Sequence, residues 1–417
     1  MSGTRVELVT IGDELLLGFT IDTNAAHLAR ALASMGMHIA QRTTVGDDPK
    51  EIGRVVGEAL DRTGAVITTG GLGPTSDDMT KASIAAIFGR EMVVDQEHLE
   101  WMKDRWRTRF NREMPALNVN QALVPTGAEK LQNNHGSAPG IWLEDDRRRW
   151  VAMLPGVPRE MRGMLADTLL PKLASRFAAG TVVRSHTLRT VGIAESLLAE
   201  HIESMPGGPL TGVLAYLPSV AGVDLRLTVR DIPSADADAA LARDAKRLRE
   251  RVGEWIYGEG DQDLAAIVLD LLRARRLTLA VAESCSGGLL GERLTAIPGS
   301  SDVVLGGVIA YANSVKEQLL RVDPEAIRAH GAVSEEVVRQ MAKGARDATG
   351  ASVGLAITGI AGPSGGSVEK PVGTVWVAAD IAGEAHTRKL LLWGDRDEIR
   401  QRSAQWTMDL LRQKLSR

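Results

Sequence analysis

The chain has 417 residues, which predicts two or three domains, because a domain usually holds about 100–200 residues. Apolar residues make up 44% and charged residues 24%, a composition that excludes collagen-like, fibrous and wholly disordered proteins. The 49 lysines and arginines against 53 aspartates and glutamates give a net charge of −4. This balance supplies no general attraction for nucleic acid or for an anionic membrane, so neither is an expected partner.

The cysteine content and the chain's apolar runs point to the cytoplasm. Cys285 is the single cysteine, which excludes an internal disulfide and a cysteine-based zinc site and fits a reducing compartment. No long apolar run follows a basic start, which argues against a secretory signal. No stretch approaches about 20 uninterrupted apolar residues, so no transmembrane helix is expected.

Strand-like and helix-like segments alternate over the first 170 residues. The patterns predict strands at 6–11, 38–45 and 65–69 and helices at 23–36 and 49–61, the first of them beginning at Asp22. Strands separated by helices form parallel sheets with both faces covered. We therefore expect an α/β domain at 1–170, with binding residues where its strands end.

The chain changes character near residue 171. Strand patterns at 181–190 and 223–230 and an alanine-rich helix at 235–252 predict a small α/β domain at 171–256. Residues 257–261 are typical of a linker or a helix start. The last domain, 257–417, is expected to begin with a helix at 264–275 and to continue with strands at 277–282, 353–358 and 372–379.

A glycine-rich turn follows the third predicted strand and opens a helix. Its residues of interest are Gly70, Gly71, Gly73, Thr75, Asp77 and Asp78. Glycines let a ligand approach the backbone N–H groups, which suits phosphate. The segment has neither the Walker nor the G-x-G-x-x-G pattern, so an ATPase or a Rossmann dehydrogenase is not indicated. The two carboxylates could hold Mg²⁺ beside the phosphates or could simply cap the helix.

A second polar group follows the first predicted strand. Asp13 lies directly after that strand, and Asn24 comes a few residues later. Together they could bind ribose hydroxyls or a metal, or could serve only as turn and cap residues.

Three segments, GDELLLGFTIDTN, TTGGLGPTSDDMT and LPGVPREM, resemble the N-terminal domain of the CinA family over about residues 4–170. That domain is similar to the molybdopterin-binding fold, a three-layer αβα architecture. The resemblance implies a metal-dependent ADP-ribose pyrophosphatase, with Mg²⁺ as the expected cation. It implies phosphate or ADP-ribose binding by Gly70, Gly71, Gly73, Thr75 and Asn24. It implies metal binding by Asp13, Asp77, Asp78 and Glu160, although Glu160 also suits a helix start.

The last domain carries two loops of the same kind. Ser284, Ser286 and Gly287 follow one predicted strand, and Thr358 and Gly359 end another. Two such loops at one cleft could hold a mononucleotide. The serines have no Asp–His pair near them, which argues against a Ser-His-Asp triad. Cys285 adjoins a helix start, but a lone cysteine more often packs than reacts.

A serine nucleophile still needs a base, and a desolvated lysine with a lowered pKa can act as one. Lys316 lies about one turn into a helix that Asn313 is expected to cap, where the helix dipole disfavours a cation. Tyr311 precedes this helix and could orient the pair. The alternative is that Ser301 caps a turn and that Lys316 is a solvated helix residue.

Six further segments resemble the C-terminal CinA domain over about residues 262–415; they are AESCSGG, IPGSSD, GGVIAYANSVKEQLL, HGAVSEEVVRQMAKGA, ITGIAGPSGGSVEKPVGTVWVA and GDRDEIR. That domain is an αβα amidohydrolase, similar to enzymes that convert nicotinamide mononucleotide (NMN) to nicotinic acid mononucleotide and ammonia without a cofactor. The resemblance implies Ser301 as nucleophile, Lys316 as base and Tyr311 in support. It implies NMN binding by Ser284, Ser286, Gly287, Thr358, Gly359 and Arg396.

The family resemblance also implies a homodimer and a role in pyridine nucleotide recycling. Ser286 stands where the family usually has threonine, which keeps the hydroxyl and removes a methyl group. A different class of function stays open at this point. In that alternative, the chain is a nucleotide- or pterin-binding regulatory or scaffold protein linked to competence.

Overall fold

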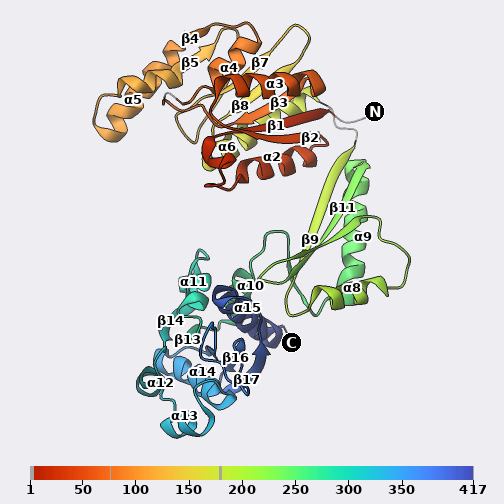
Figure 1. Cartoon of the computed structure of the whole chain (residues 1–417). Coiled ribbons are helices and arrows are strands. Elements are labelled where there is room, and N and C mark those ends of the chain that lie inside the picture. Colours follow the sequence, from red (N-terminus) through yellow and green to blue (C-terminus); the bar gives the residue numbers. More distant parts are fainter. Residues whose placement is uncertain (1–3, 76, 178–180, 417) are drawn as a thin grey trace. The chain divides into compact units, whose positions relative to one another are not determined.

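The computed structural model describes residues 4–75, 77–177 and 181–416 (Figure 1). The chain forms two compact units, one made of residues 1–184 with 229–239 and the other of residues 185–228 with 240–417. The first unit holds the N-terminal sheet, and the second holds the C-terminal sheet. The three-domain boundaries expected at 170/171 and 256/257 stay a prediction.

The N-terminal sheet has six strands in the order β2-β1-β3-β8-β7-β6. Their bounds are β1 (Arg5–Ile11), β2 (His38–Val45), β3 (Ala65–Thr69), β6 (Glu129–Leu131), β7 (Gly140–Glu144) and β8 (Trp150–Leu154). The strands β2, β1, β3 and β8 are parallel, whereas β7 and β6 are antiparallel to their neighbours. The sheet is therefore mixed rather than wholly parallel, and the carboxyl ends of four strands meet at one edge.

Helices cover both faces of this sheet (Figure 1). One face packs on α2 (Thr23–Ser34) and α6 (Pro158–Met164), and the other on α3 (Pro49–Thr63) and α4 (Thr80–Ile87). Alternate residues of β1 serve the two cores, since Leu8 belongs to the first and Val9 to the second. The predicted three-layer αβα architecture is confirmed. The other elements of this unit are α1 (Asp13–Leu16), β4 (Met92–Val94), α5 (Gln96–Phe110), η1 (Ala116–Ala122), β5 (Leu123–Pro125), η2 (Leu165–Leu169) and α7 (Leu170–Arg176).

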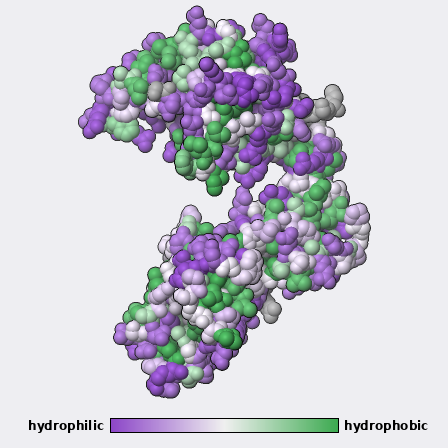
Figure 2. Space-filling model, in the orientation of Figure 1, coloured by the Kyte–Doolittle hydropathy of each residue, from purple (hydrophilic) through white to green (hydrophobic). Residues whose placement is uncertain are grey.

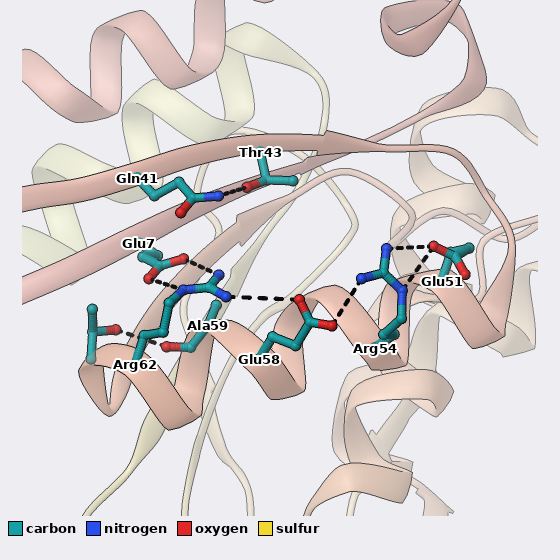
Figure 3. A network of polar contacts seen from close by, with 9 residues as sticks. Glu7, Gln41, Thr43, Glu51, Arg54, Glu58, Ala59 and Arg62 are labelled. Carbon is teal, nitrogen blue, oxygen red and sulfur yellow. Dashed lines mark hydrogen bonds and ion pairs between the residues drawn. The ribbon is translucent and has the colours of Figure 1, made fainter.

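An ion-pair network fixes α3 against the sheet (Figure 3). The Arg62 guanidinium donates from Nε and Nη2 to the two carboxylate oxygens of Glu7, at 2.9 and 2.8 Å. Glu7 lies on β1 and is only 2% exposed. The bidentate geometry gives this buried carboxylate two charge-assisted hydrogen bonds. Along the outer face of α3, Glu58 continues the chain of ion pairs from Arg62 to Arg54.

The middle of the chain forms a four-stranded sheet in the order β10-β11-β9-β12. Its elements are β9 (Val182–Thr190), α8 (Glu195–Glu203), β10 (Val213–Pro218), β11 (Val223–Ile232), α9 (Ser234–Val252) and β12 (Ile256–Glu259). The expected small α/β fold is confirmed. The prediction of a linker or helix start at 257–261 is wrong for its first three residues, because they belong to β12. This strand pairs antiparallel with β9, a partner about 70 residues earlier that no local pattern reveals.

The C-terminal sheet has five strands in the order β14-β13-β15-β16-β17. The strands are β13 (Leu279–Glu283), β14 (Val304–Ile309), β15 (Val353–Gly359), β16 (Thr374–Ile381) and β17 (Glu384–Leu391). The helices are α10 (Leu264–Arg275), α11 (Leu289–Thr295), η3 (Ser300–Asp302), α12 (Asn313–Leu320), α13 (Pro324–His330), α14 (Glu335–Thr349) and α15 (Arg396–Leu415).

Two cores make this domain a second αβα sandwich. Leu279 and Val281 of β13 pack with α10, α11 and α15, whereas Ala280 and Ala282 pack with α12 and α14. The strand β13 is parallel to both of its neighbours, β14 and β15, so the loops that follow all three strands leave from one edge. No helix within residues 4–75, 77–177 and 181–416 is long and apolar enough to cross a membrane.

Candidate functional site

A buried carboxylate fixes the loop that follows β13. Glu283 ends this strand and is 1% exposed. Its carboxylate accepts the backbone N–H groups of Gly288, Leu290 and Gly291, at 3.0, 3.0 and 2.8 Å. These three donors lie at the start of α11, where N–H groups lack partners within the helix. The loop is thereby held at both of its ends, by the strand and by the helix.

A buried lysine approaches the first serine of this loop. The Lys316 Nζ donates to Ser284 Oγ at 3.1 Å and to the carbonyl oxygens of Ala310 and Tyr311 at 2.7 and 3.3 Å. The side chain is 1% exposed, and desolvation by burial lowers the pKa of its amine below the usual 10.5. In the neutral amine, two hydrogens can serve the two carbonyls. The lone pair is then left to accept the Ser284 hydroxyl proton.

Contrary to the prediction from sequence, the structure does not bring Ser301 and Lys316 together within one chain. Ser301 lies in η3, before β14 begins, whereas Lys316 follows that strand. The six residues of β14 therefore separate them by about 20 Å at roughly 3.3 Å per residue. Ser301 is exposed, and no hydrogen bond of the described residues joins its side chain to the lysine. Ser284 instead leaves β13 at the carboxyl edge, where Lys316 also lies.

Two details of the lysine's helix also differ from expectation. Ala312, not Asn313, is the N-cap of α12, and no side chain caps this helix. The alternative of a solvated Lys316 is wrong as well, because the side chain is buried. Burial follows from the inward position of Lys316 on α12, which packs against α14.

Tyr311 and Arg396 meet at the same edge of the sheet. The Arg396 guanidinium donates to the Tyr311 hydroxyl at 2.8 Å and to the Gly362 carbonyl at 2.6 Å. Arg396 is the first residue of α15 and is exposed. The structure therefore joins two residues of the predicted site with the loop that follows β15. An exposed guanidinium fork at this place suits a phosphate.

Among the other predicted NMN-binding residues, Thr358 and Ser286 are buried, whereas Gly287 is exposed. The buried Thr358 hydroxyl donates to the Ala332 carbonyl at 2.8 Å, and Gly359 ends β15 against the backbone of β16. Ser286 is fully buried, and its hydroxyl has no hydrogen-bond partner among the described residues. Gly287 has a φ of +61°, a conformation that favours glycine and lets the loop turn into α11.

Cys285 follows Ser284 directly. The thiol is buried, and desolvation raises its pKa to about 12, which makes it a packing residue as expected. The backbone N–H groups of Cys285 and Ser286 donate to no other residue in the described part of the chain. Two such donors beside a serine hydroxyl are suited to bind an oxyanion.

A cavity of about 540 Å³ lies at the carboxyl edge of the N-terminal sheet. This volume falls in the range of small-molecule sites. No lysine, arginine or histidine is present among its described lining residues, whereas six carboxylates line it. Seven predicted site residues line it, namely Asn24, Gly70, Gly71, Gly73, Asp77, Asp78 and Glu160.

The glycine loop of this cavity is held by Asp78. The Asp78 carboxylate accepts the N–H groups of Gly73 and Thr75, at 2.7 and 2.8 Å, and also the Thr75 hydroxyl. The prediction that Gly73 and Thr75 offer N–H groups to phosphate is therefore wrong for this conformation. The Gly71 N–H donates to no described residue and stays available. Gly70 has a φ of +110° and lies so near the Ile11 carbonyl that a side chain would not fit.

A carboxylate that the sequence patterns did not single out lies beside Asp13. The Asp13 and Asp47 side chains each accept the other residue's backbone N–H, at 3.2 and 3.0 Å. Burial raises the pKa of the Asp47 carboxyl; the hydrogen bond from the Asp13 N–H lowers it, and the charges of Asp13, Glu14 and Asp77 raise it further. Asp47 follows β2, the neighbour of β1, so the strand order supplies the signal that its local sequence lacks.

These carboxylates do not form a complete metal site by themselves within the described part of the chain. No three His, Cys, Asp or Glu side chains of the described residues form a metal-binding group. Asp78 is taken up by its own loop, and Glu160 accepts the Asn133 amide at 2.7 Å. Asp13, Asp47 and Asp77 each keep at least one oxygen that accepts no hydrogen bond from the described residues. Mg²⁺ often takes only one or two protein carboxylates, with waters and phosphate oxygens completing its shell.

Asn24 supplies an unused polar atom in the cavity wall. Its amide nitrogen donates to Thr69 Oγ1 and to the Gly156 carbonyl, at 3.2 and 2.7 Å. Its Oδ1 atom is buried and accepts no hydrogen bond from the described residues. Buried polar atoms are rarely left unpaired, so this acceptor points to a ligand or water with a donor group.

Family models match three consecutive parts of the chain. Residues 7–175 match a probable molybdopterin binding domain, residues 185–258 the damage-inducible protein CinA KH domain, and residues 261–415 the CinA C-terminal domain. The KH assignment names the small middle domain, for which the sequence patterns predicted only an α/β fold.

Relatives match over nearly the whole chain. A CinA-like protein of Gemmatimonas aurantiaca is 62% identical over 99% of this chain and 96% of its own length. A CinA-like protein of Salinibacter ruber is 44% identical over 99% of this chain and all of its own length. A crystal structure of a competence/damage inducible protein from Agrobacterium tumefaciens is 38% identical, with a TM-score of 0.36, and covers 37% of this chain and 94% of its own. The chain belongs to the CinA family.

Proposed function

We propose that the chain is a hydrolase whose C-terminal site converts NMN and water to nicotinic acid mononucleotide and ammonia. The observation that carries this proposal is the hydrogen bond between the buried Lys316 amine and Ser284. The resemblance of this domain to NMN amidohydrolases supplies the substrate. The exposed Arg396 fork supports a substrate that carries one phosphate.

In the first step, Ser284 Oγ attacks the carboxamide carbon, and its proton moves to the neutral Lys316 amine. The N–H groups of Cys285 and Ser286 stabilise the oxyanion. The protonated amine then returns its proton to the leaving nitrogen, and ammonia departs. A water molecule gives a proton to Lys316 and attacks the acyl-serine, which releases the carboxylate and restores the hydroxyl. The Ala310 and Tyr311 carbonyls hold the amine in place throughout.

Ammonia release from NMN by the purified full chain tests this proposal. We expect turnover in the presence of a chelator, because no step uses a metal. Nicotinamide riboside, which lacks the phosphate, should be a poorer substrate through a higher KM. If NMN is not hydrolysed at any pH between 6 and 10, the proposed activity fails.

We also propose a second activity, the hydrolysis of ADP-ribose to AMP and ribose 5-phosphate at the N-terminal cavity. The acidic lining without a single described basic residue is the specific observation in its favour, since a diphosphate enters such a cavity only with a cation. When bound, a divalent cation held by Asp13, Asp47 or Asp77 would neutralise the diphosphate and activate a water. The Gly71 N–H would bind a phosphate oxygen, and Asn24 Oδ1 would accept a hydroxyl.

Chelation separates the two activities. ADP-ribose cleavage should stop in EDTA and return when Mg²⁺ is added in excess, while NMN hydrolysis continues. Unchanged ADP-ribose cleavage in EDTA would refute the metal role. ADP-ribose that raises the melting temperature without turnover would instead favour the binding-protein alternative, in which the domain regulates or scaffolds partners linked to competence.

A further inference from the structure

A second pocket adjoins the acidic cavity of the N-terminal domain. Its volume is about 310 Å³, and it lies between α5, the loop at 135–137 and the start of α6. Val157 and Glu160 line both the pocket and the cavity, so the two spaces are neighbours. None of the residues predicted from sequence lines this pocket except Glu160.

The pocket has the opposite charge to the cavity. Arg105, Arg109 and Arg159 line it, and none of them forms an ion pair with any carboxylate in the described part of the chain. Glu160 is the one carboxylate of its lining, and that group already accepts the Asn133 amide. Three guanidinium groups with no carboxylate partner among the described residues favour an anionic ligand.

Two aromatic rings line the same pocket. The Trp106 and Phe110 ring centroids lie 4.7 Å apart at an angle of 44°. Phe110 is half exposed, and the Arg109 guanidinium lies over its face at 5.6 Å. The outer end of α5 is largely hydrophilic in Figure 2. Exposed aromatic faces beside arginines are the common platform for a nucleotide base.

We propose that this arginine pocket, defined by Arg105, Trp106, Arg109, Phe110 and Arg159, binds the nucleoside monophosphate half of the N-terminal substrate. The inference rests on the proposed pyrophosphatase function. The base would stack on the aromatic rings, and the arginines would hold the adjoining phosphate. The ribose 5-phosphate half would occupy the acidic cavity, with the P–O–P bond at the junction near Glu160. Water adds across that bond, and the two monophosphates separate into their own pockets.

The test is the binding of AMP to the full chain by calorimetry, with EDTA present so that no metal contributes. The variant carrying Arg109→Gln and Arg159→Gln should bind AMP roughly tenfold more weakly or worse, because two charge-assisted contacts are lost. Arg107→Gln is the matched control, since Arg107 lies on the same helix outside the pocket. The affinity for ribose 5-phosphate, measured separately with Mg²⁺ in excess because the acidic cavity needs a cation, should stay within about twofold in all variants.

Three outcomes would overturn the inference. The first is an unchanged AMP affinity in the double variant. The second is an equal loss for AMP and ribose 5-phosphate, which would show only general attraction of anions. The third is a change of oligomeric state on gel filtration, which would make the pocket an interface. The proposed catalysis is tested separately. If the wild-type chain never cleaves ADP-ribose but the double variant still loses AMP affinity, the AMP subsite is supported and the pyrophosphatase activity is not.

Discussion

The two candidate sites occupy the same topological position and have opposite electrostatics. Each lies where parallel strands end and a glycine-containing loop leads into a helix. The C-terminal site is built around a buried amine, whereas the N-terminal cavity is lined by carboxylates with no described basic partner. The architecture therefore decides where chemistry can occur, and burial and charge decide which chemistry it is.

One carboxylate in each domain shapes the loop beside it, although Glu283 is buried and Asp78 is only partly buried. The Asp78 carboxylate accepts hydrogen bonds from N–H groups of its own glycine loop, and the Glu283 carboxylate accepts hydrogen bonds from N–H groups at the start of α11. In both domains, one acidic side chain gives up any reactive role to shape the loop beside it. In the two proposed mechanisms, the reactive groups are neighbours of that side chain, namely Ser284 in one domain and Asp77 with Asp13 in the other.

The largest expected effect is the fall in the rate of NMN hydrolysis when the Ser284 hydroxyl is removed. Ser284→Ala should lower kcat for NMN by about 10⁴-fold, because the nucleophile is removed. ADP-ribose cleavage and the melting temperature should be unchanged. Ser301→Ala is the matched control and should keep the wild-type rate in an ammonia-release assay. A full rate in Ser284→Ala, or a comparable loss in Ser301→Ala, would refute the assignment.

The second-largest expected effect is the fall in kcat/KM for NMN when the Lys316 amine, the proposed base, is removed. Lys316→Met keeps the apolar stem and removes the amine, so kcat/KM for NMN should fall by about 10²–10⁴-fold. In the wild type, kcat/KM should fall as the pH drops through the lowered pKa of Lys316, because the protonated amine cannot accept the serine proton. In Lys316→Met, the pH–rate profile of the residual activity should lose this acidic limb, that is, the fall of kcat/KM at low pH. A retained limb would show that another group acts as the base.

A smaller effect is expected from Glu283. In Glu283→Gln the side chain loses its charge and one acceptor oxygen, so at least one buried N–H group at the start of α11 loses its partner. We expect a loss of about 1–3 kcal/mol in the free energy of unfolding and a drop in kcat for NMN of about tenfold. Denaturant melts and NMN kinetics measure the two. An unchanged kcat would mean that the loop keeps its shape without the carboxylate.

The last prediction concerns stability alone and a buried lysine of the N-terminal domain. Lys81 is 4% exposed, donates to the Asn120 and Gln121 carbonyls, and has its pKa lowered by burial to about 8. The unfolded chain binds this proton below pH 10.5, so stability should decline as the pH falls from 10.5 toward 8, by at most about 1.4 kcal/mol per unit. Lys81→Met should remove this slope from denaturant melts. A slope that persists would assign the pH dependence to other groups.

Local sequence patterns were sufficient for most of the fold. The predicted strands at 38–45 and 65–69 and the helix at 264–275 match the structure to the residue. The predicted helix start at Asp22 is confirmed by the hydrogen bond that its side chain accepts from the Ala25 N–H. Such elements depend on neighbours a few positions away, which a pattern contains. The strand at 256–259 depends on a distant partner and was missed.

The sites were predicted less completely, for the same physical reason. Motifs identified Lys316, Tyr311 and Arg396, but the choice between Ser284 and Ser301 depends on which end of β14 each residue approaches. Asp47 was missed because only the strand order brings it to Asp13. The arginine pocket was missed because its defining residues come from α5 and the start of α6, two separate segments with no recognisable spacing.

The surroundings of Lys316 have a consequence for how such a site changes over evolutionary time. Two of the three oxygens around its amine belong to the main chain, and every amino acid carries such an oxygen. Position 310 can therefore drift to another small side chain without disturbing the amine. Only positions 284 and 316, which stand 32 residues apart, must be inherited together. Selection then acts on two residues that are far apart in the sequence rather than on one contiguous motif.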